Sequence, residues 1–197
     1  VPDNLSGVER QRLVGQLVVD LSKEEGDLLR ATVNGLLAKM DEKGASDIDL
    51  GGTGCRGLVW YRVYGEKEPD DSTETLSEDE TDVMLHSLLM ESQRDFLFEH
   101  RNLDFSYTMQ WQAQDFRFRA DLYFDLDHLA LNMRLIATDI RPFKGLGLHP
   151  NVVRAIMLAY NKQGLTLVTG ITGSGKSSTL DSIIDANNQT VDAHIVI

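Results

Sequence analysis

The N-terminal part of the sequence carries apolar side chains at the spacing of a helix. Leu13, Leu17 and Leu21 recur at every fourth residue, which predicts an amphipathic helix. A second helix is predicted by another set of apolar positions: Leu28, Leu29, Val33, Leu36, Leu37 and Met40. Gly44 would end it, because glycine readily adopts the left-handed conformation that closes a helix. We expect residues 1–40 to form a helical segment with no chemistry of its own.

From Ser46 onward the period changes to that of strands. Alternation and a high content of aromatic and β-branched residues predict five strands: residues 47–50, 58–64, 103–111, 116–124 and 129–136. The connections are predicted to be a glycine turn, a polar loop and a hairpin loop: residues 51–54, 65–76 and 112–115. Ser77 and Glu80 form a capping box that opens a further helix. Residues 41–140 are thus expected to form a small antiparallel α+β domain.

The last part of the sequence has the order of elements found in a parallel α/β domain. Proline and glycine mark a linker at residues 141–149. The segments that follow are predicted to be helix, strand, helix and strand: residues 150–162, 165–169, 178–188 and 194–197. A parallel sheet needs several strands covered on both faces. We therefore expect residues 150–197 to be the first part of a longer domain and the overall class to be α/β.

Between the predicted strand and the second of these helices lies a phosphate-binding motif. The segment Gly170-Ile-Thr-Gly-Ser-Gly-Lys-Ser177 matches G-x-x-x-x-G-K-[ST], the Walker A pattern, in full. Its glycines let backbone N–H groups approach an anion at a helix N-terminus. Lys176 would reach the β- and γ-phosphates of ATP, and the Ser177 hydroxyl would hold Mg²⁺. The expected contact residues are Thr172, Gly173, Ser174, Gly175, Lys176, Ser177 and Ser178.

Composition narrows the class of protein. The 197 residues carry a formal net charge of -12, which argues against a general nucleic-acid binder, because phosphate backbones attract basic surfaces. Cys55 is the one cysteine, so an internal disulfide is excluded and a reducing cytoplasm is expected. No apolar run reaches the length that spans a bilayer, and no signal-peptide pattern is expected. The five histidines are scattered without the spacing of metal ligands, so we predict no histidine metal site. The one metal contact we predict is that of Ser177 with Mg²⁺ in the phosphate-binding loop.

Several segments of the sequence resemble a known family. Residues 164–186 and the closing His194-Ile-Val-Ile197 are similar to the type IV pilus retraction (twitching-motility) ATPases, within the type II/IV secretion ATPase superfamily. Upstream, four short segments fall in the order of that family's N-terminal PAS-like domain: Ala45-Ser-Asp-Ile-Asp-Leu, Tyr61-Arg-Val-Tyr-Gly-Glu, Leu103-Asp-Phe-Ser-Tyr and Phe116-Arg-Phe-Arg-Ala-Asp. The resemblance implies a PAS-like α+β domain followed by the start of a truncated RecA-like P-loop domain.

The resemblance also implies a function. Members of this family are hexameric motor ATPases on the cytoplasmic face of the inner membrane, where a pilus or secretion platform protein is their partner. Their PAS-like domain supplies arginines to the nucleotide phosphates, and Arg119 and Arg134 stand at the matching positions. We therefore expect Lys176, Arg119 and Arg134 to be the catalytic residues of an ATPase that drives pilus retraction. The alternative, which we weigh equally, is that Arg117, Arg119 and Arg134 are surface charges on alternating strands.

Two features keep alternatives open. Where the family has Gln-Arg-Gly-Gly after the arginine strand, this chain has Asp125-Leu126-Asp127-His128. A pilus assembly or type II secretion ATPase, or a regulatory subunit that binds nucleotide without turnover, therefore remains possible. Walker B and the group that orients the attacking water cannot be assigned within residues 1–197. We expect the full-length protein to be an ATPase and this chain alone to be inactive.

Overall fold

A computed structural model describes residues 2, 4–136, 140–171, 174–192 and 194–196. Contacts divide the chain into two compact units, Val1–Ile136 and Ala137–Ile197. Within the described residues, no helix is both long enough and apolar enough to cross a membrane.

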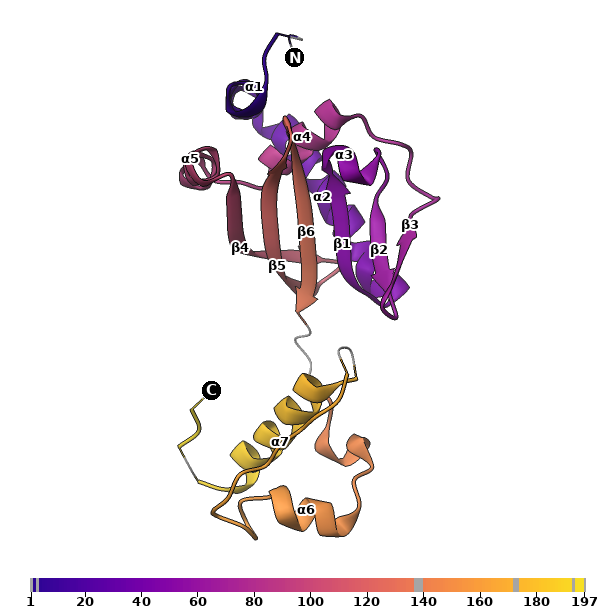
Figure 1. The fold of residues 1–197 in the computed structure, drawn as a ribbon, viewed down its shortest axis with the longest axis vertical. Helices are drawn as coiled ribbons and strands as arrows, with labels where there is room; N and C mark the ends of the chain where they lie inside the picture. Colours follow the sequence, from indigo (N-terminus) through magenta and orange to yellow (C-terminus); the bar gives the residue numbers. More distant parts are fainter. Residues whose placement is uncertain (1, 3, 137–139, 172–173, 193, 197) are drawn as a thin grey trace. The chain divides into compact units, whose positions relative to one another are not determined.

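The first unit is built on one antiparallel sheet (Figure 1). Its six strands are β1 (Ala45–Gly51), β2 (Trp60–Val63), β3 (Glu66–Pro69), β4 (Asn102–Trp111), β5 (Gln114–Asp125) and β6 (His128–Ile136). Their spatial order is β3-β2-β1-β6-β5-β4, so the first and last strands of the sequence pair at the centre of the sheet. All five predicted strands are confirmed within a few residues.

Five helices accompany the sheet: α1 (Gly7–Val19), α2 (Lys23–Lys43), α3 (Gly52–Cys55), α4 (Glu78–His86) and α5 (Glu91–His100). α2 and α4 pack on one face of the sheet (Figure 1). α1 packs on α4 and α5. The helix ends follow the sequence signals: Ser77 and Glu80 form the predicted capping box, and Gly44 closes α2 with φ of 63°.

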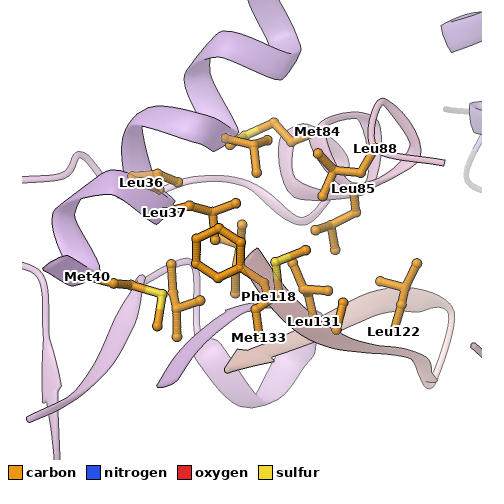
Figure 2. Packing of buried hydrophobic residues seen from close by; sticks show 14 of the residues in the cluster. Leu36, Leu37, Met40, Met84, Leu85, Leu88, Phe118, Leu122, Leu131 and Met133 are labelled. Atoms are coloured by element: carbon orange, nitrogen blue, oxygen red, sulfur yellow. The ribbon is translucent and has the colours of Figure 1, made fainter. Parts of the chain in front are cut away.

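The core lies between α2, α4 and the covered face of the sheet. Figure 2 shows side chains of these elements pointing toward one another. Leu37 and Met40 of α2, Leu85 of α4, and Phe118 and Met133 of the sheet are all fully buried or nearly so. Burying each such side chain stabilises the fold by roughly 1.5–3 kcal/mol. α2 extends past residue 40, and its buried residues are part of this core. The predicted division into residues 1–40, 41–140, 141–149 and 150–197 stays a prediction.

Two predicted connections in this unit were wrong, because each contains regular structure, and two further details differ from expectation. The glycine turn at residues 51–54 contains the short helix α3, and the polar loop contains β3. β3 is an edge strand whose four residues are all exposed, so it has no apolar alternation. α5 was not predicted, because its apolar residues Phe96, Leu97 and Phe98 are consecutive instead of helically spaced. The hairpin loop is also tighter than expected, since β5 begins at Gln114.

The second unit contains a short 3₁₀ helix, η1 (Phe143–Leu146), and the helices α6 (Pro150–Ile156) and α7 (Lys176–Thr190). The predicted helix at residues 150–162 ends early. The buried Asn187 of α7 explains this, because its Oδ1 accepts a hydrogen bond from Leu158 N at 2.7 Å. That side chain competes with the helical hydrogen-bond pattern beyond Ile156.

The two strands predicted for this unit are absent from its described residues. Residues 165–169 are irregular, with Leu165 and Leu167 exposed, and residues 194–196 are irregular too. Ile197 lies outside the described residues. A strand needs a neighbour to pair its backbone groups, and the described part of this unit offers none. The apolar, β-branched composition of residues 165–169 is therefore not sufficient to form a strand in this unit.

Candidate functional site

The helix predicted to follow the phosphate-binding loop is present. α7 begins at Lys176, and Gly175 at its N-cap has φ of 84°, a conformation that glycine adopts without strain. Thr179 N bonds to Gly175 O at 2.9 Å, which closes the first helical turn. Among the described residues no side chain caps the helix, so its first backbone N–H groups can be offered to an anion. Thr172 and Gly173 lie outside the described residues.

The lysine of the motif folds back over the loop. Lys176 Nζ donates a hydrogen bond to Ile171 O at 2.8 Å, and Ser174 N donates to the same carbonyl at 3.2 Å. Ser177 and Ser178 lie in the first turn of α7. The residues that are described, Ser174 to Ser178, thus lie together around a helix N-terminus. Ammonium, hydroxyl and backbone N–H donors are the groups that hold a phosphate with its Mg²⁺.

In the first unit, the structure brings the two predicted arginines together. Arg119 of β5 and Arg134 of β6 are directly opposite each other in the strand register. Their side chains are 74% and 67% exposed, on the sheet face opposite the core. We call this face, which also carries Arg62 and Asp47, the charged face. Two like charges opposite each other repel, so the pair favours an anion or nearby carboxylates.

Each arginine has a carboxylate neighbour, but the two differ. Asp47 Oδ1 accepts a hydrogen bond from Arg134 Nε at 2.8 Å. Asp104 Oδ1 lies 3.7 Å from Arg119 Nη2, and both side chains are mostly exposed. An exposed pair of this kind contributes little, whereas a pair with a buried partner is better fixed. The sequence did not identify Asp47 as a site residue, although its alternation with Asp49 along β1 puts both aspartates on the charged face.

The segment Asp125-Leu126-Asp127-His128, which departs from the family pattern, forms hydrogen bonds that hold neighbouring helices. Asp125 Oδ2 accepts hydrogen bonds from Thr53 Oγ1 at 2.8 Å and from Gly54 N at 3.0 Å, which fixes α3. The bond from Gly54 N is the main reason that the pKa of Asp125 is lowered. Asp127 Oδ1 accepts from Gly7 N at 2.7 Å, at the start of α1. The acids in this segment therefore anchor α3 and α1 to the end of the β5–β6 hairpin.

A buried polar network completes the attachment of α1. Gln11 is 0% exposed, and its Nε2 donates to Asp82 Oδ2 at 2.6 Å and to Asp127 O at 2.9 Å. Its Oε1 lies 3.0 Å from His86 Nε2. Burial lowers the pKa of His86 to about 3, and the nearby Arg94 adds to this. His86 is thus a neutral hydrogen-bond donor in the interior.

His128 brings together a group of side chains that the sequence spacing did not suggest. Ligand atoms of Asp79, Asp82 and His128 all lie within 4.8 Å of one another. His128 Nδ1 is 2.8 Å from Asp82 Oδ2, and Arg10 pairs with Asp79. Leu129 N donates to Asp82 Oδ1 at 2.8 Å. Protein donors already serve the buried Asp82 carboxylate, so the cluster acts as part of the network that holds α1.

Comparisons with known proteins agree with the fold. No family model matches the chain. The chain is 34% identical to an Escherichia coli protein, Uncharacterized protein YggR, over 138 residues, which is 69% of this chain and 39% of that protein. It is 29% identical to the type IV pilus ATPase PilU of Pseudomonas aeruginosa over 162 residues, which is 82% of this chain and 40% of PilU.

A solved structure extends the likeness to three dimensions. The pilus retraction motor PilT with bound ADP matches with a TM-score of 0.60 and 34% identity, over 79% of this chain and 43% of that chain. The chain thus spans about 40% of the length of the relatives it matches. Its fold is a mixed α/β arrangement with an antiparallel sheet in the first unit, and the match to PilT is consistent with an N-terminal domain followed by part of an ATPase domain. The chain is related in sequence and fold to the type IV pilus retraction (twitching-motility) ATPases, within the type II/IV secretion ATPase superfamily.

Proposed function

We propose that the full-length protein is a motor ATPase that hydrolyses ATP to drive pilus retraction. The observation that carries this proposal is the Walker A segment placed at the N-terminus of α7, with Lys176 and Ser177 in the first turn. The similarity to PilU and to the retraction motor PilT supports the kind of work that hydrolysis drives. A homo-hexamer at the cytoplasmic face of the inner membrane, acting on a pilus or secretion platform protein, belongs to the same proposal.

The residues of the loop fit ATP with Mg²⁺. We assign Thr172, Gly173, Ser174, Gly175, Lys176, Ser177 and Ser178 to nucleotide binding. Lys176 exchanges the Ile171 carbonyl for phosphate oxygens, which removes one backbone contact and gains a charged one. The Ser177 hydroxyl contributes a ligand to Mg²⁺, which neutralises charge on the phosphates. Uncapped backbone N–H groups at the start of α7 hold the remaining phosphate oxygens.

Arg119 and Arg134 are the groups we assign to the charge that develops on the γ-phosphate. Phosphoryl transfer depends mainly on positioning and on stabilising charge. Two exposed guanidinium groups side by side, of which Arg134 is hydrogen-bonded to Asp47 and Arg119 lies 3.7 Å from the exposed Asp104, are suited to that purpose. A regulatory subunit that binds nucleotide without turnover is the second candidate, because Asp125-Leu126-Asp127-His128 replaces the family segment.

One experiment separates these functions. In the full-length protein, Lys176→Ala should abolish or strongly weaken Mg-ATP binding in calorimetric titration and remove phosphate release. Lys162→Ala changes an exposed lysine of the same unit and should leave both unchanged. Equal affinities for wild type and Lys176→Ala would refute the assignment of the loop. Tight binding without phosphate release by the wild type would instead support the regulatory subunit.

A further inference from the structure

A row of charged side chains crosses the charged face, with Asp47 at its centre. The strand register puts Asp47 of β1 opposite Arg62 of β2 on one side and opposite Arg134 of β6 on the other. Arg119 of β5 follows, opposite Arg134. Three arginines therefore lie in one row with a single carboxylate, and Lys67 of β3 continues the row opposite Arg62.

The Asp47 carboxylate is held firmly. The residue is 3% exposed, and its Oδ2 accepts a hydrogen bond from Ser46 Oγ at 2.6 Å. Oδ1 accepts from Arg134 Nε at 2.8 Å, and Arg62 Nε lies 3.6 Å from Oδ2. A carboxylate in such a place needs hydrogen bonds and opposite charge. Asp47 is thus a fixed anchor for whichever arginine it binds.

Arg134 is bound to Asp47 through Nε and not through its terminal Nη groups. Its Nε donates to Asp47, while neither Nη group has a protein partner among the described residues. A guanidinium is a planar group with five N–H donors in fixed directions. Fixing Nε therefore fixes the plane and leaves both Nη groups exposed. That is the part of the group that binds phosphate through two parallel hydrogen bonds.

We propose that Asp47 is a positioning residue that orients Arg134 for a phosphate of the bound nucleotide. This inference rests on the proposed function. Asp47 does not touch the phosphate; it holds Nε and reduces the repulsion between Arg134 and the opposed Arg119. The two Nη groups of Arg134 and the guanidinium of Arg119 then face one anion together. Arg62 shares the row but lies too far from Asp47 to take this place.

The first test needs no nucleotide. In the chain of residues 1–197, Arg134 Nε–H should give an NMR resonance that exchanges slowly with water, because Asp47 accepts its hydrogen. The resonance is identified by its loss in Arg134→Lys. Asp47→Asn should move it and speed its exchange, whereas Arg62→Ala, the matched control on the same row, should not. An unchanged resonance in Asp47→Asn would overturn the proposal.

The second test is a mutant cycle in the full-length protein. Asp47→Asn keeps the shape and one acceptor oxygen but removes the charge, and should lower ATP turnover roughly 10- to 100-fold, as lost positioning can. Arg134→Lys keeps the charge but lacks Nε and should fall in the same range. The double variant should be no worse than either single variant. Arg62→Ala should retain wild-type turnover.

The outcomes distinguish this inference from the function on which it rests. Normal turnover in Arg134→Ala refutes both the role of this arginine and the positioning by Asp47. A large loss in Arg134→Ala with normal turnover in Asp47→Asn refutes the positioning alone. If Asp47→Asn fails to fold, judged by circular dichroism, Arg134→Lys decides, because its side chain is mostly exposed and lysine keeps a positive charge beside Asp47. Wild-type turnover in Arg134→Lys would then overturn the proposal.

Discussion

Lys176 Nζ donates a hydrogen bond to the carbonyl oxygen of Ile171, 2.8 Å away, across the phosphate-binding loop. The lysine must leave this carbonyl to bind a phosphate, and the other parts of a hydrolytic site are not assigned within residues 1–197. We therefore expect this chain alone to bind Mg-ATP weakly and to release no phosphate above background. A phosphate-release assay with the full-length protein as positive control measures this. Robust turnover by residues 1–197 would mean that this chain carries a complete set of catalytic groups.

The second prediction concerns the arginine on β5. Arg119→Ala in the full-length protein should reduce ATP turnover by up to ~10³-fold, which is the size of effect an arginine finger can have. Arg117 is the matched control, because it is exposed on the same strand and the same face, two residues away. Arg117→Ala should retain turnover. If both variants lose activity equally, general surface charge is responsible, and if neither does, Arg119 is an ordinary surface residue.

The third prediction concerns the attachment of α1. Gln11→Ala leaves Asp127 O and the buried His86 Nε2 without their partner, which should lower the free energy of unfolding by about 1–3 kcal/mol. Urea unfolding of residues 1–197 can be followed by fluorescence, since both tryptophans, Trp60 and Trp111, lie in the first unit.

Gln16→Ala is the control for this measurement. Gln16 is exposed on the same helix, and within the described part of the chain its side chain bonds only to Asp20, one turn away. Its replacement should change stability by no more than ~0.5 kcal/mol. Similar losses in the two glutamine variants would mean that helix propensity, and not the buried network, determines the effect.

The fourth prediction is a pH dependence. Asp70 is buried, which by itself would raise its pKa, but hydrogen bonds from Thr73, Lys39 and Ser72 outweigh burial and the net effect is a lowered pKa. A lowered pKa in the folded state adds stability that is present above the unfolded value of about 3.9 and is lost as the pH falls below it. The wild type should therefore lose more unfolding free energy between pH 6 and about 2 than Asp70→Asn does.

Asp71→Asn provides the control, because it makes the same change of charge at the exposed neighbouring position. It should keep the acid dependence of the wild type. At neutral pH, Asp70→Asn should be less stable by roughly 1.5–3 kcal/mol, the contribution of hydrogen bonds to a charged group. A wild-type acid dependence in Asp70→Asn would place the responsible carboxylate elsewhere.

Features that depend on local sequence were predictable. Alternation along β5 and β6 is sufficient to predict that Arg119 and Arg134 point to the same side of their strands as other polar residues. The capping box at Ser77 and the glycine after α2 marked helix ends through backbone chemistry that acts within a few residues. The phosphate-binding loop was predictable as well, because the residues of the Walker A pattern are consecutive in the sequence.

Features that depend on long-range contacts were not predictable. Asp47 and Arg134 are 87 residues apart, and only the pairing of β1 with β6 brings them together. The same holds for Asp82 and His128, whose contact depends on where α4 packs. Residues 165–169 show the reverse case, because a run with strand composition forms no strand without a neighbour.

The last prediction uses the turn between β5 and β6. Leu126 has φ of 58° and is 74% exposed, so a bulky residue sits in the left-handed region with few contacts to compensate. That conformation costs roughly 1–2 kcal/mol for a residue with a Cβ. Leu126→Gly removes this cost but adds about 0.4–1 kcal/mol of chain entropy to the unfolded state. The net expectation is a gain of about 0.5–1 kcal/mol in the free energy of unfolding.

Leu126→Ala separates this explanation from a packing effect. Alanine keeps the Cβ and therefore the strain, so it should give no gain, while Leu126→Asn should give part of it because asparagine tolerates this conformation. A gain in Leu126→Ala equal to that in Leu126→Gly would mean that exposure of the leucine side chain matters, and not its backbone. Leu126→Arg restores the basic residue of the family at this position. If the missing contact limits catalysis, that variant should raise ATP turnover in the full-length protein without the stability gain of glycine, since arginine carries the same backbone strain.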